Sequence, residues 1–387
     1  TQRKAKMNPQ GDYAAAQRAG EVSIPFAAEL FQRVAAAAKE DANVFVSPYS
    51  VGTALALTLE GAKGDTASQL KKAIGYGPDH DVQKLHHDLV SLIHALNSVE
   101  GVELSVANAL WVSDDFKIHQ DFVKRAQELL SEARNLDFNS KPDESRQVIN
   151  SWVEDKTKTK IKDLLPAGSI KPGVPLVITN AIYFKGAWAH AFKKEHTQDH
   201  DFHLLDNSGT KTVKMMEQNK AKLRYGDFSG HAMVQLPYKG QDIVMLVLLP
   251  HQNTARALQS LVSEASLKSI NRNQRNLSQS EVNIKLPRFK FEYQVELSDL
   301  LQEMGISAPF TGKADFSPMV APDSGPEKLR ISKVFHKAFV EVNEEGTEAA
   351  AATAVVMLRS MAVMPSHVID FVVDRPFAFV IYNAPLQ

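Results

Sequence analysis

The segment from Lys337 to Pro365 constrains the fold more than any other part of the chain. It begins with a strand pattern, in which apolar and polar residues alternate as far as Asn343, and the pattern breaks at Gly346. Four consecutive alanines, residues 349–352, then follow. Surface loops are usually built from Gly, Pro, Asn, Asp and Ser, which supply turn geometry, whereas alanine supplies only small size. Small side chains suit a segment that has to enter between two existing strands without displacing a packed core.

The residues after the break keep a period of two. One face of such a strand would carry small and then apolar residues, namely Thr347, Ala349, Ala351, Thr353, Val355 and Met357. Glu348, the only charge between Gly346 and Leu358, would point to the opposite side. The pattern therefore predicts a strand that is exposed at first and can be inserted into a sheet later.

The residues around Gly346 closely resemble the hinge of the serpin family of protease inhibitors. The matching residues are Phe335-His336-Lys337-Ala338 and Glu341-Val342-Asn343-Glu344-Glu345-Gly346-Thr347-Glu348-Ala349-Ala350. Other blocks resemble serpin landmarks in the order in which that family has them, namely 43–50, 180–188, 213–216 and 374–377. The resemblance covers the chain from about Ser23 to its end. In serpins a cleaved loop inserts into the central sheet, which releases stored strain.

The resemblance also implies roles for particular residues. The shutter, a polar cluster beneath the central sheet, is matched by Ser47, Ser50, Asn180 and His336, and the breach, where insertion starts, by Trp188. The hinge is matched by Glu344, Gly346, Thr347, Glu348, Ala349, Ala350, Ala351, Ala352 and Thr353. Hydroxyls, an amide and an imidazole can exchange hydrogen-bond partners as strands part. Without the resemblance, these residues would be interpreted as satisfied polar groups of the core.

Arg359 is the predicted bait for a protease. It lies in an apolar segment beside Leu358 and is followed by the small Ser360, so it offers a long cation to an acidic specificity pocket. The alternative is an incidental surface arginine. The usual family distance from Glu344 places the cut one residue later, after Ser360. Neighbouring candidates for the cleaved bond are Leu358 and Met361, and Met364 is a more distant one.

Hydrophobic periodicity predicts helices in the first half of the chain and strands in the second. The first helix is expected after Ser23 with Pro25 in its first turn, and residues 1–22 are expected to form a flexible extension. Further helices are predicted at 48–61, 65–74, 85–96, 119–133 and 143–158. Strands are predicted at 43–46, 102–112, 174–184, 211–216, 231–236, 243–249, 282–291, 329–342 and 368–380.

This order of elements predicts an α+β fold. The resemblance implies a single serpin-like domain over residues 1–387, with a large central β-sheet, further sheets and a helical N-terminal half. The hinge and an exposed reactive-centre loop would occupy residues 344–366.

Charge and composition bear on partners and on location. A formal net charge of −1 argues against electrostatic binding to nucleic acid or to an anionic membrane. The absence of cysteine removes disulfides, thiolate metal sites and a cysteine nucleophile. Residues 1–7 are basic and polar and do not form a signal peptide. We expect a monomer that is secreted or extracellular, its signal peptide being absent from this chain, and an intracellular location stays open.

Motifs of catalysis and ligand binding are missing or diluted. The chain has no G-x-S-x-G elbow, glycine-rich phosphate loop or H-E-x-x-H helix, so no enzyme activity and no cofactor are predicted. A cluster of metal-ligand types is interpreted as a solvated connection beside an edge strand, namely His196, Asp199, His200, Asp201 and His203. A weak polyanion patch is interpreted as a solvated helix face, namely Lys71, Lys72, Lys84, His86 and His87.

The resemblance and the hinge composition together predict an inhibitory serpin. A serine endopeptidase, expected to be trypsin-like, would cleave at or next to Arg359 and be trapped as a covalent complex when the loop inserts. Two alternatives remain. The protein could be a non-inhibitory serpin that carries a ligand or acts as a chaperone, or it could inhibit cysteine proteases with the same trap.

Overall fold

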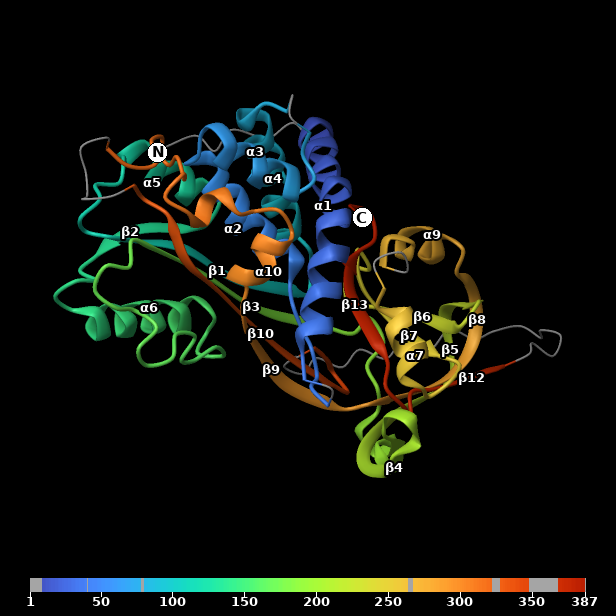
Figure 1. The fold of residues 1–387 in the computed structure, drawn as a ribbon. Coiled ribbons are helices and arrows are strands. Elements are labelled where there is room, and N and C mark those ends of the chain that lie inside the picture. Colours follow the sequence, from blue (N-terminus) through green and yellow to red (C-terminus); the bar gives the residue numbers. More distant parts are fainter. Residues whose placement is uncertain are drawn as a thin grey trace.

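The computed structural model consists of a six-stranded and a seven-stranded β-sheet, with helices packed mainly on the six-stranded one (Figure 1). It describes residues 9–39, 41–77, 80–263, 267–321, 328–347 and 368–386, with side chains from residue 13 onward. The helices are α1 (Pro9–Ala37), α2 (Pro48–Glu60), α3 (Gly64–Ala73), α4 (Val82–Asn97), α5 (Gln120–Glu128), α6 (Pro142–Lys156), α7 (Ala255–Leu261), α9 (Ile270–Arg275) and α10 (Ser298–Glu303). Three short 3₁₀ helices are η1 (Lys194–His196), η2 (Leu205–Asn207) and η3 (Ala308–Phe310).

The central sheet has six strands in the order β2-β1-β3-β11-β10-β9. These strands are β1 (Val102–Ser113), β2 (Glu132–Leu136), β3 (Leu176–Ala187), β9 (Phe289–Glu296), β10 (Ile331–Asn343) and β11 (Gly346–Thr347). The other sheet has the order β12-β8-β5-β6-β7-β13, with β4 paired to β5. Its strands are β4 (Gln198–His203), β5 (Thr210–Phe228), β6 (His231–Pro237), β7 (Ile243–Pro250), β8 (Ser278–Pro287), β12 (Ile369–Val372) and β13 (Ala378–Asn383). Helices followed by strands in two sheets confirm the predicted α+β class.

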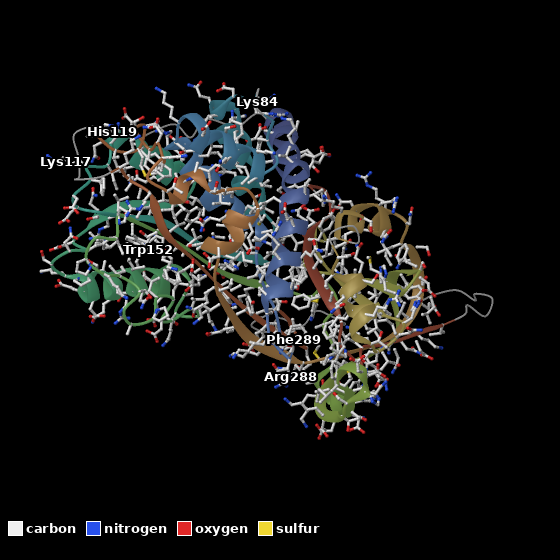
Figure 2. All side chains as sticks on the ribbon, viewed as in Figure 1. Lys84, Lys117, His119, Trp152, Arg288 and Phe289 are labelled. Atoms are coloured by element: carbon white, nitrogen blue, oxygen red, sulfur yellow. The ribbon has the colours of Figure 1, made fainter. Side chains whose placement is uncertain are left out.

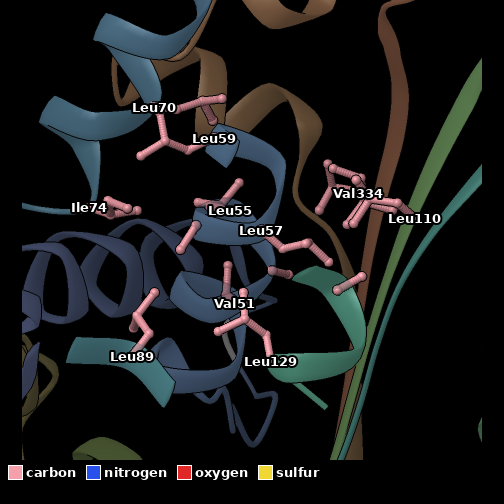
Figure 3. Packing of buried hydrophobic residues seen from close by; sticks show 14 of the residues in the cluster. Val51, Leu55, Leu57, Leu59, Leu70, Ile74, Leu89, Leu110, Leu129 and Val334 are labelled. Carbon is pink, nitrogen blue, oxygen red and sulfur yellow. The ribbon is translucent and has the colours of Figure 1, made fainter. Parts of the chain in front are cut away.

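The six-stranded sheet is buried on both faces because alternate side chains of its strands enter different apolar clusters. On β1, Leu110 faces the large cluster beneath α1 to α5, and Trp111 faces the cluster beneath α6. Trp111 packs edge-on against Trp152 of α6, which Figure 2 labels between that helix and the sheet. Figure 3 shows Leu110 and Val334 of the sheet approaching the apolar side chains of α2. The sheet is therefore a middle layer between helices.

Helix α2 is buried along most of its length, as its composition predicts. Ser47 caps its start by accepting a hydrogen bond from the backbone N–H of Ser50, and Pro48 occupies the first turn, where a missing donor costs little. The cap residue is also a predicted shutter residue. Its backbone N–H donates to His336 of β10, which fixes the start of α2 beneath the central sheet.

Helix α1 corrects the prediction that residues 1–22 form a flexible extension. It begins at Pro9, and Pro25 lies inside it rather than in its first turn. Ala15, Ala16 and Ala19 are at most 2% exposed. Alanine has the highest helix propensity, and a stripe of small side chains lets helices approach closely, yet it lacks the large apolar residues from which an amphipathic helix is predicted.

Several other predicted elements differ from the observed ones. Residues 43–46 belong to no strand, and 119–133 divides into α5 and β2. The predicted strand at 282–291 divides at Arg288 into β8 and β9, which belong to different sheets, and 368–380 divides into β12 and β13. A continuous apolar pattern does not record that a chain passes from one sheet to another. Among the helices that the structure describes, none combines the length and apolarity needed to cross a membrane.

Candidate functional site

Strands β3 and β10 form the seam of the central sheet. They pair directly and in parallel from Leu176 and Ile331 to Tyr183 and Phe339. Beyond this stretch, β11 lies between them and pairs antiparallel with both neighbours. Thr347 is opposite Val342 of β10 and Gly186 of β3. Two residues of the predicted hinge are thus already strand residues inside the sheet.

The turn that leads into β11 requires glycine at residue 346. Gly346 has a φ of +147°, which residues with a Cβ rarely adopt. A Cβ at this position would also overlap the carbonyl oxygen of Gly186 on β3. Close approach to the neighbouring backbone and the unusual φ therefore both exclude a side chain.

The segment after β3 holds this turn through its backbone. The N–H of Trp188 donates to the carbonyl of Glu345 at 2.9 Å, and the N–H of Phe192 donates to that of Glu344 at 2.8 Å. The indole Nε1–H of Trp188 donates to the carbonyl of Asn343 at 3.0 Å. Trp188, the predicted breach residue, therefore contacts the hinge directly, and its role in insertion stays a prediction.

The hinge carboxylates, in the turn between β10 and β11, make ion pairs with residues outside the sheet's centre. Glu344 is 4% exposed; it accepts a hydrogen bond from the Thr197 hydroxyl at 2.8 Å and faces Arg288 Nη1 at 3.6 Å. Burial acts to raise the pKa of Glu344. The hydrogen bond from Thr197 and the charge of Arg288 act to lower it, and the net result is a pKa below the ordinary value. Glu345 pairs with Lys194 at 2.7 Å. Figure 2 shows Arg288 where the chain passes from β8 to β9.

Thr347 is completely buried against an aromatic pair. Its hydroxyl forms a 2.7 Å hydrogen bond with the hydroxyl of Tyr238, which is also completely buried. The ring of Tyr238 stacks on Trp188 with a centroid distance of 4.5 Å. Burial raises the pKa of the Tyr238 hydroxyl. Tyr238 was not predicted as a site residue, because it follows β6 in the sequence and nothing there relates it to the hinge.

The four predicted shutter residues lie together under the direct pairing of β3 and β10. The amide oxygen of Asn180 accepts hydrogen bonds from the hydroxyl of Ser50, at 2.9 Å, and from Nδ1 of His336. The backbone N–H of Ser47 donates to Nε2 of His336 at 3.2 Å. A fifth member, Asn108, accepts from the Asn180 amide and donates to the carbonyl of Ser50. Asn108 was missed, although the alternation of β1 placed this amide among apolar residues of one face.

These hydrogen bonds fix the protonation state of His336. Because Nε2 accepts from Ser47, the ring proton is on Nδ1, from which it is donated to Asn180. The side chain is 0% exposed, and burial lowers the pKa of His336 to about 3. The cluster is therefore neutral at physiological pH and joins α2, β3 and β10 without a formal charge.

The remaining residues predicted for the hinge and the cleaved bond lie outside the described residues. They are Glu348, Ala349, Ala350, Ala351, Ala352, Thr353, Leu358, Arg359, Ser360, Met361 and Met364. The position of the cleaved bond therefore stays a prediction.

Some residues of the other polar clusters noted in the sequence have local partners in the structure. Asp199 on β4 pairs with Lys214 of β5, and no group of metal-ligand side chains with suitable geometry occurs among the described residues. His86 is held between Glu60 and Glu128, so it is not available to a polyanion.

Comparison with known proteins identifies the family. The model of the family Serpin (serine protease inhibitor) matches residues 21–387. The leukocyte elastase inhibitor of Bos taurus is 38% identical over 351 residues, which are 89% of this chain and 90% of the relative. The chain belongs to the serpin family.

Solved structures agree with this assignment. Serpin48 of the insect Tenebrio molitor has a TM-score of 0.81 and 29% identity, covering 98% of this chain and 97% of its own. Human thyroxine-binding globulin, solved in complex with thyroxine, has a TM-score of 0.83 and 28% identity, covering 96% of both chains. Protease inhibition is thus supported by the names of relatives, and a protein named for thyroxine binding shares the same fold.

Proposed function

We propose that the protein is an irreversible, suicide-substrate inhibitor of serine endopeptidases. The observation that carries this proposal is β11, because Gly346 and Thr347 already separate β3 from β10 at one end of the seam. A strand that begins inside a sheet needs only to be extended. We also propose that residues 1–387 form one serpin-like domain, with the hinge and reactive-centre loop at 344–366.

The proposed reaction stops halfway through proteolysis. The serine hydroxyl of the protease attacks the carbonyl carbon of Arg359, the bond to Ser360 breaks, and the amine of Ser360 leaves with the proton. The protease is then esterified to Arg359 at the end of a segment that begins at β11. Extending β11 along the seam carries the ester and the protease away from the loop's original position, which deforms the protease before water hydrolyses the ester.

The gain from insertion is large enough for this purpose. About a dozen newly paired residues, each contributing about 0.5–1.5 kcal/mol of net hydrogen bonding, give on the order of 10 kcal/mol. This is comparable with the stability of a whole domain. Opposing it is the direct pairing of β3 with β10 and the hydrogen bonds of Asn180 and His336 across the seam.

Arg359 supports a trypsin-like target. A long cation followed by the small Ser360 suits an acidic specificity pocket. An elastase-like target is the alternative, since relatives are named leukocyte elastase inhibitor and the neighbouring Leu358 and Met361 are apolar. The relatives give no support for the extracellular location expected from the sequence, and an intracellular location is equally compatible with them.

A ligand-carrier function is the second candidate. It is favoured by the similarity to thyroxine-binding globulin, which was solved in complex with thyroxine. The inhibitor proposal differs because it needs loop insertion after cleavage, whereas a carrier does not. Inhibition of cysteine proteases by the same trap is a variant of the first proposal.

Incubation with trypsin-like, chymotrypsin-like and elastase-like proteases tests the proposal. The expected result is a covalent band on a denaturing gel, formed fastest with the trypsin-like enzyme. The mass of the released C-terminal peptide identifies the cleaved bond. Cleavage without a covalent band, and without a rise in melting temperature, would instead support the carrier, whereas a covalent band with cysteine proteases alone would reassign the target class.

Substituting Thr347→Arg should convert the inhibitor into a substrate. Thr347 is completely buried between β3 and β10, and an arginine there would bury an unpaired charge at a cost of several kcal/mol. We expect the loop to be cleaved at the normal rate, with the covalent fraction reduced at least about tenfold, which corresponds to about 1.4 kcal/mol.

The matched control is Thr347→Ser, which keeps the hydroxyl that contacts Tyr238 and should retain the covalent complex. Persistence of the complex in the arginine variant, at wild-type yield, would refute insertion at this position.

A further inference from the structure

A second polar cluster lies where helices α2, α4 and α5 meet, on the helical side of the central sheet (Figure 1). It consists of Glu60 at the end of α2, His86 on α4, and Arg125 and Glu128 on α5. The side chain of Glu60 is 1% exposed and that of His86 is 17% exposed. None of these residues takes part in the seam between β3 and β10.

His86 bridges two carboxylates through both nitrogens of its ring. Nδ1 is 2.7 Å from Glu60 Oε1, and Nε2 is 2.7 Å from Glu128 Oε2. An ionised carboxylate only accepts hydrogen bonds, and a neutral imidazole has only one N–H. Both contacts are therefore hydrogen bonds only when His86 carries two ring protons, as an imidazolium.

The burial of Glu60 decides which of the two contacts is lost with this proton. Its second oxygen faces Arg125 Nε at 3.4 Å and has no hydrogen-bond partner. If His86 lost a proton, one of the two carboxylates would face a lone pair. Because Glu60 is buried and the side chain of Glu128 is 61% exposed, the remaining ring proton stays on Nδ1 towards Glu60, and the contact with Glu128 is the one that is lost. The contact between α4 and α5 therefore depends on the charge of His86.

Helix α5 connects this cluster to the central sheet. It stands between β1 and β2 in the chain, and β2 is the edge strand of the six-stranded sheet. Its start is held by the backbone hydrogen bond from His119 to Met319, and Phe122 and Ala126 bury its inner face. Its last residue is Glu128, so the contact with His86 fixes the end that leads into β2.

We infer that Glu60, His86 and Glu128 form a proton-dependent clasp, which fixes α5 and the following edge strand β2 to α2 and α4 while His86 is protonated. The charged groups that face His86 are Glu60 from α2 and Glu128 from α5, with Arg125 on the far oxygen of Glu60. The clasp does not rest on the proposed inhibitory function, because its effect is on local stability.

The direction of the pH dependence follows from this geometry. The hydrogen bond to Glu60 raises the pKa of His86, burial opposes it, and Glu128 adds to the increase. A raised pKa means that the stabilisation is complete below the ordinary value of 6.5 and is lost as the pH rises through the raised value. The clasp is therefore closed in acid and opens towards alkaline pH.

A second contact on the same helix provides a matched control. Asp88 of α4, 3% exposed, pairs with Arg18 of α1 through Nη2 at 2.7 Å and Nε at 3.2 Å. Arginine stays protonated throughout the relevant range. Arg18 and His86 thus tie α4 to different neighbours, one independently of pH and the other not.

Hydrogen–deuterium exchange of the wild-type protein at pH 6.5 and 8.5, corrected for intrinsic rates, is the first test. We expect uptake in residues 120–136 to rise several-fold at the higher pH, while α6, residues 142–156, does not change. Equal changes in both segments would overturn the clasp, and this measurement does not depend on a variant that folds.

Thermal unfolding of His86→Gln, Glu128→Gln and Arg18→Gln is the second test. At pH 6, His86→Gln should melt roughly 2–4 °C below the wild type, and this difference should shrink towards pH 9. Glu128→Gln should reduce the pH dependence in the same direction, whereas Arg18→Gln should lower the melting temperature equally at both pH values. A His86→Gln deficit that is constant with pH would overturn the clasp.

Discussion

The two ends of the seam between β3 and β10 differ in what separates the strands. At the shutter they pair directly, and the neutral hydrogen bonds of Asn180 and His336 join them. At the breach β11 lies between them, surrounded by an aromatic pair and by ion pairs such as Lys194 with Glu345. The comparison indicates that β3 and β10 are already separated at one end of the seam and are held together at the other.

The chemistry of the two ends follows their exposure. The Lys194 side chain is 70% exposed, so its pairing with Glu345 removes little hydration. His336 is completely buried, where a charge would lose its hydration without a compensating partner. In the proposed insertion this deep contact would have to break and re-form, and neutral groups can exchange hydrogen-bond partners at a smaller cost than charged ones.

The largest effect is expected for Asn180→Ala, which breaks the shutter. The substitution leaves His336 Nδ1 and the Ser50 hydroxyl without their acceptor in a buried site, at a cost of about 3 kcal/mol. We expect a lower melting temperature and faster uptake of a synthetic peptide with the sequence of residues 346–358, followed on a native gel.

Asn150→Ala is the control for this substitution. Asn150 is a buried amide of α6 that makes two hydrogen bonds with the backbone of Leu165, away from the seam. It should lose comparable stability but leave the rate of peptide uptake unchanged. Equal acceleration by both variants would mean that the shutter has no specific part in opening.

The next effect concerns the pH dependence of the shutter. The folded pKa of His336, about 3, lies below its ordinary value of 6.5, so its contribution to stability is complete above pH 6.5 and decreases as the pH falls towards 3. At pH 5 the loss is about 2 kcal/mol, since each pH unit contributes about 1.4 kcal/mol. Denaturant unfolding of the wild type and of His336→Gln between pH 5 and 7.5 measures it. Parallel curves for the two proteins would contradict a buried neutral imidazole.

The smallest effect is expected at the breach, from Tyr238→Phe. This change removes the hydrogen bond to Thr347 and keeps the ring stacked on Trp188, so the expected loss is about 1 kcal/mol. A double-mutant cycle with Thr347→Val isolates the coupling of the two hydroxyls. Additive effects in that cycle would show that the hydroxyl pair does not hold β11 in place.

The parts of the site that share a local pattern could be predicted from the sequence. The hinge is one continuous run, and its glycine and small residues indicate both the turn and the insertable strand. The shutter residues are recognised only through family resemblance, because Ser47, Asn180 and His336 come from distant segments. Asn108 joins the shutter because β1 pairs with β3, and Tyr238 reaches the hinge through Thr347 and Trp188, contacts that no local pattern in the sequence records.

The fold was predicted where periodicity is strong and missed where it is weak or interrupted. Strand β3 was predicted from an apolar run that the structure buries on both faces. Helix α1 was predicted too short, because its first turns pack through alanines. The change of sheet at Arg288 was missed, since apolar alternation continues on both sides of it.

The start of α1 has a consequence for the far end of the chain. The Tyr13 hydroxyl donates to the carbonyl of Pro385, and Leu386 is buried in the same apolar cluster as Ala16. Removing the first turns of α1 would therefore remove contacts that hold the residues after β13, the last strand of the seven-stranded sheet.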